Sequence, residues 1–72
     1  MTRDEWIAAF AKELGVEAPR PDQVDAILAL AGTAAHATER TAAPIAAWLA
    51  GVSGRTLGEL DSLAGQISEP TA

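Results

Sequence analysis

Residues 22–40 read DQVDAILALAGTAAHATER, and this stretch decides the fold class. Apolar residues recur in it at the three- and four-residue spacing of one helix face: Val24, Ile27, Leu28, Ala31, Ala34 and Ala35. Asp22 is a favourable N-cap, so the pattern predicts a helix over residues 23–39. Leu30 falls off this face, and we therefore expect the helix to be buried on two sides.

Small side chains are concentrated in the second half of this stretch. Ala31, Gly32, Ala34 and Ala35 are expected to let another helix approach closely. Gly32 also weakens the helix, by up to ~1 kcal/mol relative to alanine. The chain as a whole is rich in alanine and poor in β-branched residues, a composition that favours helix over strand.

The residues before this helix predict another one over residues 3–14. Thr2 and Glu5 have the spacing of a capping box, in which the side chain of each bonds to the backbone of the other. An apolar face follows at helical spacing: Trp6, Ile7, Phe10 and Leu14. Gly15 stands where a left-handed residue ends a helix, and residues 16–21, which hold two prolines, are typical of a connector.

A third helix is predicted over residues 43–52. Thr41 is its candidate cap, and Pro44 suits its first turn, where a missing amide hydrogen costs little. Its apolar face comprises Ile45, Trp48, Leu49 and Val52. We expect Gly51 and Gly54 to end it.

A fourth helix is predicted over residues 57–68. Thr56 and Glu59 repeat the spacing of a capping box at its start. Its apolar stripe comprises Leu57, Leu60, Leu63, Ala64 and Ile67. Residues 69–72 include Pro70, and we expect them to form a frayed tail.

The sequence therefore predicts an all-α fold, a compact bundle of about four short helices in a single domain spanning residues 1–72. We expect the apolar faces of these helices to fold onto one another. A chain of 72 residues buries only roughly 60% of its unfolded surface, so its stability is marginal. Apolar residues make up 49% of the chain, which is high for so small an interior and favours self-association or a protein partner.

Charge and composition exclude several classes of function. The net charge is −5 and the five Lys and Arg residues are scattered, which disfavours binding to nucleic acid or to an anionic membrane. With no cysteine and one histidine, we expect no disulfide, no metal site and no cofactor. No signal-peptide pattern and no apolar run of membrane-spanning length is visible, so we predict a cytoplasmic protein.

Motifs for catalysis are missing from the sequence. It holds no Gly-rich phosphate loop, no metal-binding helix motif and no nucleophile elbow. Carboxylate pairs such as Asp4–Glu5 and Glu59–Asp61 lie near predicted helix starts, where they stabilise the helix dipole. We therefore expect no catalytic residues, and a protein that is not an enzyme on its own.

Residues 36–51, HATERTAAPIAAWLAG, hold the candidate site for a ligand or partner: His36, Arg40, Thr41, Pro44 and Trp48. In a structural interpretation, which we favour, His36 and Arg40 share one helix face and stabilise the helix end as cations. In a functional interpretation, they converge with free amides at the next helix start on one anion. Trp6 and Trp48 are expected in the core, with partial exposure of one at an interface as the alternative.

Short motifs also follow one another in a fixed order along the chain. They are Trp6, Glu13-Leu14-Gly15, Asp25 with Leu28, Leu30 and Ala31, His36, Glu39-Arg40, Ala42-Ala43-Pro44, and Leu49 with Gly51. In this order they resemble an uncharacterised family of small bacterial helical domains, found alone or joined to molybdenum cofactor guanylyltransferase. Thr41 stands where that family often has proline, which implies a less rigid turn.

The resemblance implies a non-catalytic accessory or protein-interaction module, linked to molybdenum cofactor nucleotide biosynthesis or to molybdenum enzyme assembly. Its partner would then be a protein of one of these processes. One alternative is a small subunit of a molybdenum-dependent oxidoreductase such as formate dehydrogenase. A second alternative, from the residues themselves, is a small anionic-ligand binder that uses His36 and Arg40.

Overall fold

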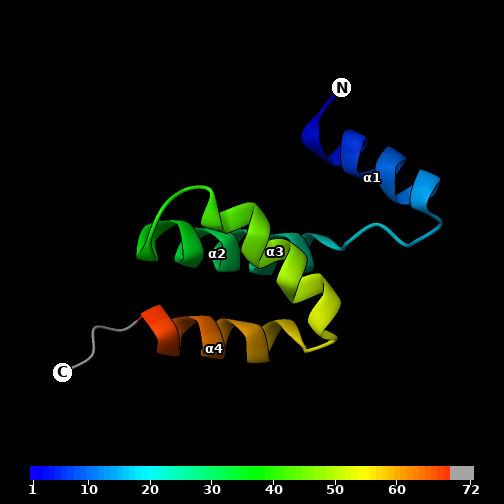
Figure 1. The fold of residues 1–72 in the computed structure, drawn as a ribbon. Helices are drawn as coiled ribbons and strands as arrows, with labels where there is room; N and C mark the ends of the chain where they lie inside the picture. The colour runs from blue at the N-terminus through cyan, green and yellow to red at the C-terminus, as the bar shows by residue number, and fades with distance from the viewer. Residues whose placement is uncertain (69–72) are drawn as a thin grey trace.

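The computed structural model describes residues 1–68, and these form four helices (Figure 1). They are α1 (Arg3–Leu14), α2 (Pro21–Ala37), α3 (Ala42–Ser53) and α4 (Leu57–Ser68). The prediction of an all-α fold with four short helices is confirmed, and the bounds predicted for the first and last helices agree with the structure. The tail expected over residues 69–72 lies outside the described residues.

Helix α2 is the centre of the bundle, because both α3 and α4 pack against it. The chain reverses direction from α2 to α3 and again from α3 to α4 (Figure 1). Leu30 of α2 is only 6% exposed and lies beside both neighbouring helices. The expected burial of α2 on two sides is therefore confirmed, and Leu30 is the side chain on which the two contacts converge.

Helix α3 packs with the opposite face from the one that the sequence predicted. Its half-buried residues are all alanines: Ala42, Ala43, Ala46, Ala47 and Ala50. The expected core residues Ile45, Trp48, Leu49 and Val52 are exposed instead. A face of alanines lets the backbones of two helices come close together, and α2 presents small half-buried residues at Ala31, Ala34 and Ala35. Small alanine side chains, rather than large ones, thus form the α3 side of this contact.

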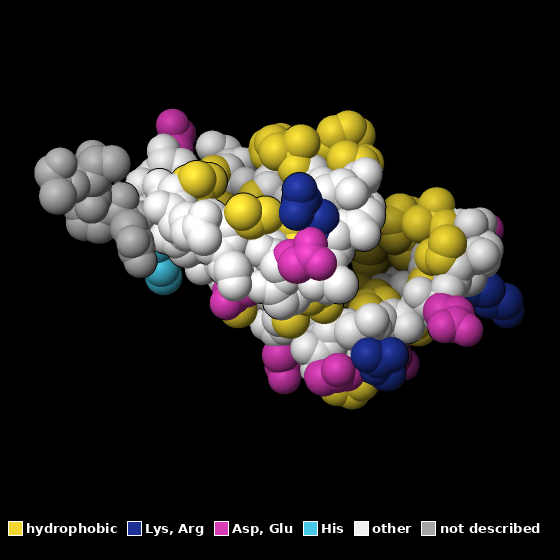
Figure 2. Space-filling model, turned by 90° about the horizontal axis from the view of Figure 1, so that it is seen from below, with side chains coloured by type: hydrophobic (Ala, Val, Ile, Leu, Met, Phe, Trp, Pro, Cys, Tyr) yellow, Lys and Arg dark blue, Asp and Glu magenta, His cyan; other side chains and the backbone are white. Residues whose placement is uncertain are grey.

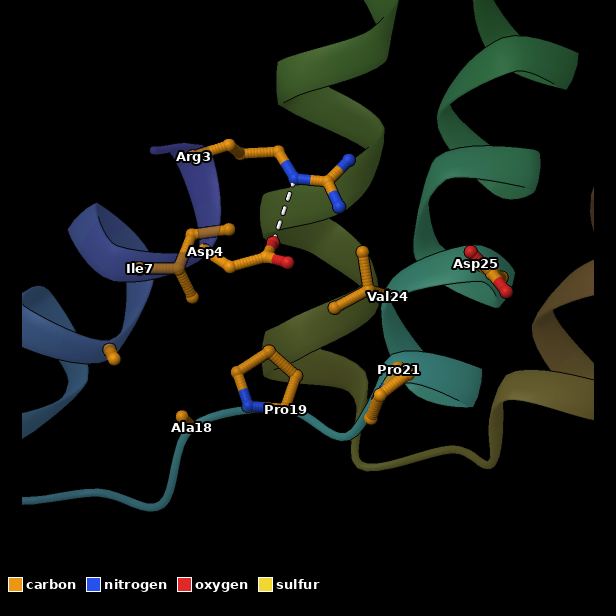
Figure 3. Close-up of a pocket in the computed structure, with 9 residues that line it drawn as sticks. Arg3, Asp4, Ile7, Ala18, Pro19, Pro21, Val24 and Asp25 are labelled. Carbon is orange, nitrogen blue, oxygen red and sulfur yellow. Dashed lines mark hydrogen bonds and ion pairs between the residues drawn. The ribbon is translucent and has the colours of Figure 1, made fainter. Parts of the chain in front are cut away.

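Helix α1 lies at one end of the molecule, beyond the bundle of the other three (Figure 1). Its half-buried Ile7 lies near Pro19 of the connector and Val24 of α2, around a hollow of about 310 Å³ (Figure 3). The larger side chains of its apolar stripe, among them Trp6 and Phe10, are exposed. The molecule is accordingly elongated, 45 × 23 × 19 Å.

The first helix is defined by its two ends. Thr2 Oγ1 accepts a hydrogen bond of 3.1 Å from the Glu5 amide, and the Glu5 carboxylate accepts one of 2.9 Å from the Thr2 amide. Gly15, with φ of 74°, ends the helix in the left-handed conformation. The predicted capping box and C-cap of α1 are both confirmed.

The start and end of α2 differ from the prediction. The helix begins at Pro21, so Asp22 lies inside its first turn and is not the cap. Proline favours the first helical position because its φ angle is already helical. The Arg20 amide before it donates to Gln23 Oε1 over 2.8 Å. The helix ends at Ala37, two residues earlier than predicted.

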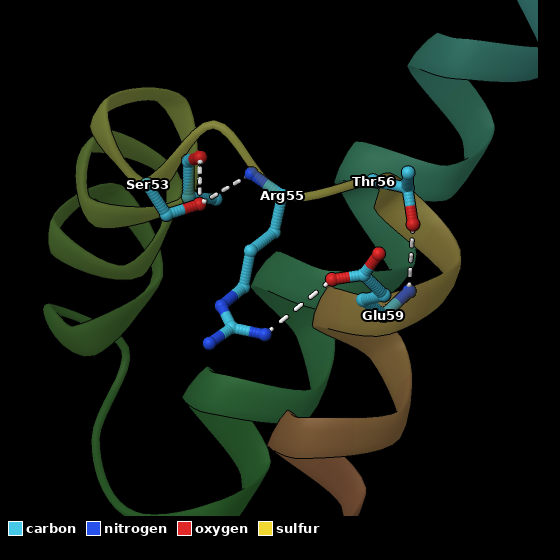
Figure 4. A network of polar contacts seen from close by, with 5 residues as sticks. Ser53, Arg55, Thr56 and Glu59 are labelled. Carbon is cyan, nitrogen blue, oxygen red and sulfur yellow. Dashed lines mark hydrogen bonds and ion pairs between the residues drawn. The ribbon is translucent and has the colours of Figure 1, made fainter.

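A network of polar contacts fixes the turn between α3 and α4 (Figure 4). Ser53 Oγ donates to the Ala50 carbonyl over 2.8 Å and accepts from the Arg55 amide over 3.1 Å. Arg55 also forms an ion pair of 3.4 Å with Glu59, whose amide donates to Thr56 Oγ1 over 3.2 Å. The amide half of the capping box predicted at Thr56 is thus present, while the carboxylate pairs with Arg55.

Two details of α3 correct the sequence prediction. Thr41 makes no capping bond with its side chain, because its hydroxyl donates to Glu39 Oε2 over 3.4 Å. Gly51 lies inside the helix, which ends two residues later at Ser53. Gly54 follows with φ of 72°, a conformation that favours glycine, and it is the C-cap as predicted.

Replacing Leu30 should destabilise the whole domain. We expect Leu30→Ala to lower the free energy of unfolding by about 2–5 kcal/mol, the usual cost of deleting a buried leucine side chain. Leu28 on the same helix is 52% exposed, so Leu28→Ala should change stability by no more than ~0.5 kcal/mol. Urea unfolding followed by circular dichroism measures both values. Equal losses for the two variants would contradict the central position of Leu30.

Two glycines should respond in opposite ways to alanine. A Cβ atom at Gly32 would meet nothing within 4 Å, so Gly32→Ala should stabilise α2 by up to ~1 kcal/mol. Gly54→Ala should destabilise the domain by about 1–2 kcal/mol, because it forces an L side chain into the left-handed region. Thermal unfolding compares the two. A loss of stability for Gly32→Ala would mean that α2 needs glycine for close packing.

The capping box should make α1 sensitive to acid. The bond from the Thr2 amide lowers the pKa of Glu5 below its usual 4.5. The pKa of Glu5 is therefore lower in the folded protein than in the unfolded chain. The stability that the cap contributes is fully present above pH 4.5, and it is lost as the pH falls through the pKa of the folded protein. An NMR titration of the Glu5 side chain should show this pKa, and Thr2→Pro, which fits the φ of −77° at this position but has no amide hydrogen, should return it toward 4.5. Thr33→Ala, which removes a mid-helix hydroxyl bonded to Ala29, is the control and should leave Glu5 unchanged.

Candidate functional site

The outward side of α3 is the most unusual surface of the molecule. Over its twelve residues the helix carries no charged side chain, and Ser53 is its only polar one. Four large apolar side chains project from it into solvent, and we call them the α3 outer face: Ile45, Trp48, Leu49 and Val52. A helix that is apolar on all sides is normally buried. The α3 outer face is therefore suited to contact with another molecule.

Both tryptophans lie outside the core. Trp48 is 66% exposed and Trp6 is 56% exposed, so the expectation that they are core residues is wrong. In α3 the reason is the alanine face, which occupies the side turned toward α2. In α1 the covered positions are Ile7 and Ala11, and Ile7, rather than an aromatic ring, lies near Pro19 and Val24. Large amphipathic rings of this kind are favoured contact residues in protein interfaces.

An open apolar groove of about 450 Å³ lies between α2, α3 and α4. We call it the α2–α4 groove, and its main lining residues are Leu30, Ala34, Ile45, Leu49, Ala64 and Ile67. Two of them, Ile45 and Leu49, belong to the α3 outer face, while Trp48 and Val52 do not line the groove. Its polar side chains are Thr38 and Ser68, and the Ser68 hydroxyl already donates to the Ala64 carbonyl.

A second groove, of about 420 Å³, opens on the other side of Leu30. It lies between α2, the end of α3 and the start of α4, and the charged residues Glu17 and Arg55 are among those that line it.

In the space-filling view, hydrophobic side chains gather over the bundle and again over the end of the molecule that holds α1, with a hollow between them (Figure 2). Exposed apolar surface is thus concentrated in a few areas.

The predicted contact residues lie in and around the turn between α2 and α3, and all five are exposed. His36 is in the last turn of α2, Arg40 and Thr41 are in the turn itself, and Pro44 is in the first turn of α3. Because α2 ends at Ala37, His36 and Arg40 do not share a helix face, which corrects the geometry expected from their spacing. The candidate Trp48 lies one turn further along α3, on its outer face.

The start of α3 does not offer the free amides that an anion site requires. The Ala42 amide donates to the Glu39 carbonyl over 2.9 Å, and the Ala43 amide donates to the Arg40 carbonyl over 3.1 Å. Pro44 has no amide hydrogen. These two amides, which would have held an anion together with Arg40, are therefore already hydrogen-bonded within the turn. The geometry thus gives less support to an anion site than the sequence pattern did.

Polar groups elsewhere in residues 1–68 form no cluster of three or more potential metal ligands. The three ion pairs of this part of the chain, Arg3–Asp4, Arg20–Asp22 and Arg55–Glu59, are local and exposed. Pairing with Arg20 lowers the pKa of the Asp22 carboxyl, and this stabilises the charge beside the start of α2.

Among these helices, none has both the length and the apolar character needed to cross a bilayer.

The exposure of Ile45, Leu49 and Val52 was missed by the sequence reasoning, although a signal for it was present. Residues 42–53 hold alanines at one set of helical positions and large apolar residues at the other, with no charge between them. Such a helix has two apolar faces, and a domain of this size has only enough interior for one of them. The absence of a polar face was therefore the signal that one of the two apolar faces would be exposed.

Comparisons with known proteins place the chain in a family. The family described as "Domain of unknown function (DUF6457)" matches residues 1–71, nearly the whole chain. Comparison with curated proteins and with solved structures gives no significant match. Since the match covers the four helices and both grooves, the chain is a member of the DUF6457 family.

Proposed function

We propose that the chain is a non-catalytic protein-interaction module, and that its α2–α4 groove binds an apolar segment of a partner protein. One observation carries this proposal: α3 turns its alanines inward and its large apolar side chains outward. Ile45 and Leu49 thereby form one wall of the groove, opposite Ile67 of α4. Water contact with this surface is unfavourable, and a partner that covers it gains the free energy of apolar burial.

The chemistry of the groove favours a protein segment over a small polar ligand. Sites for small molecules place a few polar groups precisely to orient the ligand. In this groove the Ser68 hydroxyl is already bonded, and Thr38 is the other polar side chain. An amphipathic helix needs only an apolar channel for its large side chains at positions three and four residues apart. Such a helix is the occupant that we propose.

The resemblance noted in the sequence supports a partner connected with molybdenum. Members of that family occur joined to molybdenum cofactor guanylyltransferase, and a domain joined to an enzyme in some proteins is a candidate to bind it non-covalently in others. We therefore propose the guanylyltransferase as the first partner to test. The alternative partner is a molybdenum-dependent oxidoreductase such as formate dehydrogenase, of which this chain would be a small subunit.

A charge placed in the groove should abolish partner binding without unfolding the domain. Leu49 is 55% exposed, so Leu49→Lys should fold, and it should weaken binding by about 30-fold or more, as expected for loss of a main contact residue. Calorimetric titration with purified guanylyltransferase measures the affinity. The control is Leu28→Lys, which adds the same charge at an equally exposed leucine outside the groove and should bind as the wild type does.

Three outcomes would contradict this proposal in different ways. Equal weakening by Leu49→Lys and Leu28→Lys would remove the groove from the binding site. Absence of binding to the guanylyltransferase, with capture of a molybdenum oxidoreductase from the native cell, would favour the alternative partner. Capture of no molybdenum-related protein would remove the molybdenum connection.

A further inference from the structure

We propose that two copies of this chain form a symmetric dimer, in which α1 of each copy packs against Trp48 and Val52 of α3 in the other. This goes beyond the proposed function because it uses another part of the surface: neither Trp48 nor Val52 lines the α2–α4 groove. Two such contacts, related by a twofold axis, make one self-complementary interface.

The stripe on α1 supplies the first half of the contact. Trp6, Phe10 and Leu14 are spaced four residues apart, so they follow one side of the helix, and all three are more than half exposed. The rings of Trp6 and Phe10 touch, with centroids 5.1 Å apart, and form one continuous aromatic surface. Because Ile7, on another side of α1, is the residue that lies near Pro19 and Val24, this exposed stripe is available to a second molecule.

The two contact surfaces match in character, since both consist of large apolar side chains. At a rise of about 1.5 Å per residue, the stripe from Trp6 to Leu14 is roughly 12 Å long. The part of the α3 outer face that the dimer uses, from Trp48 to Val52, is shorter, roughly 6 Å by the same measure, so it meets the middle of the α1 stripe. None of the residues proposed to make the contact is charged, although each chain has a net charge of −5. The charges elsewhere on the surface are screened beyond about 8 Å at physiological salt.

The total surface of the chain is consistent with an interface of normal size. A folded monomer of 7.4 kDa is expected to expose about 4,200 Å². This chain exposes 5773 Å². Even a fully extended segment of four residues, the length of 69–72, accounts for no more than ~600 Å² of the difference. About 1,000 Å² remains as the excess surface of an elongated molecule of 45 × 23 × 19 Å, and it is of the same order as the roughly 800 Å² that each partner buries in a standard stable interface.

A second copy therefore covers the exposed apolar residues of both α1 and α3, and no other protein is needed. The connector between α1 and α2, residues 15–20, keeps α1 at the end of its own bundle, where it is available to another chain (Figure 1). In this dimer, α1 of each molecule packs against α3 of the other.

The test is the solution mass of the full 72-residue chain and three variants, by sedimentation equilibrium. The wild type should sediment at twice the 7.4 kDa of one chain. Phe10→Lys and Trp48→Lys should each raise the dimer dissociation constant by about 30-fold or more. Leu28→Lys is the matched control, since Leu28 is 52% exposed and Phe10 is 51% exposed, and it should remain dimeric. Circular dichroism should show the same helix content in all four proteins.

An equal mixture of Phe10→Lys and Trp48→Lys chains separates this dimer from others. Each mixed pair keeps one intact α1–α3 contact, so the mixture should associate more tightly than either variant alone. A wild type that stays monomeric up to ~1 mM would overturn the proposal. It would also be overturned if Phe10→Lys remained as dimeric as Leu28→Lys. In either case partner binding through Leu49 would still be measurable, so the two proposals fail separately.

Discussion

The contact between α2 and α3 is the interaction on which the rest of the structure depends. Its α3 side consists of alanines, and the α2 side includes Leu30 and the small residues that follow it, Ala31, Ala34 and Ala35. Alanine loses almost no side-chain entropy on burial, so this contact is inexpensive to form. It also buries little apolar area for each residue, which leaves the larger apolar side chains of α3 in solvent. The exposed apolar surface of α3 is a direct result of how the core is built.

Much of the fold was predictable from the sequence because helix ends depend on local chemistry. The Thr2 and Glu5 pair and the left-handed Gly15 and Gly54 were each identified from residue type and spacing. The start of α2 was misjudged because Asp22 is a good cap in isolation, while the proline before it already has the dihedral angle of a first helical residue. The preference of aspartate for the cap and the preference of proline for the first helical position predict different helix starts here, and the sequence alone does not show which of them prevails.

The candidate site was harder to predict than the fold. Periodicity finds an apolar face, but α3 has two such faces, and which one turns inward depends on the shape of α2. His36 and Arg40 were placed on one helix because four residues separate them, and the helix ends before it reaches Arg40. Only Trp48 of the predicted set lies on the α3 outer face. Surface chemistry that depends on tertiary packing or on a helix end cannot be derived from spacing.

The position of α1 at the end of the bundle has a consequence for how the molecule opens. Its backbone hydrogen bonds are protected by its two caps and by a few contacts, whereas those of α2 are covered by α3 and α4. Amide protons of α1 should therefore exchange with solvent through local opening, at a much lower free energy than those around Leu30. The domain would then consist of two cooperative units of unequal stability, a slowly exchanging bundle and a rapidly exchanging N-terminal helix.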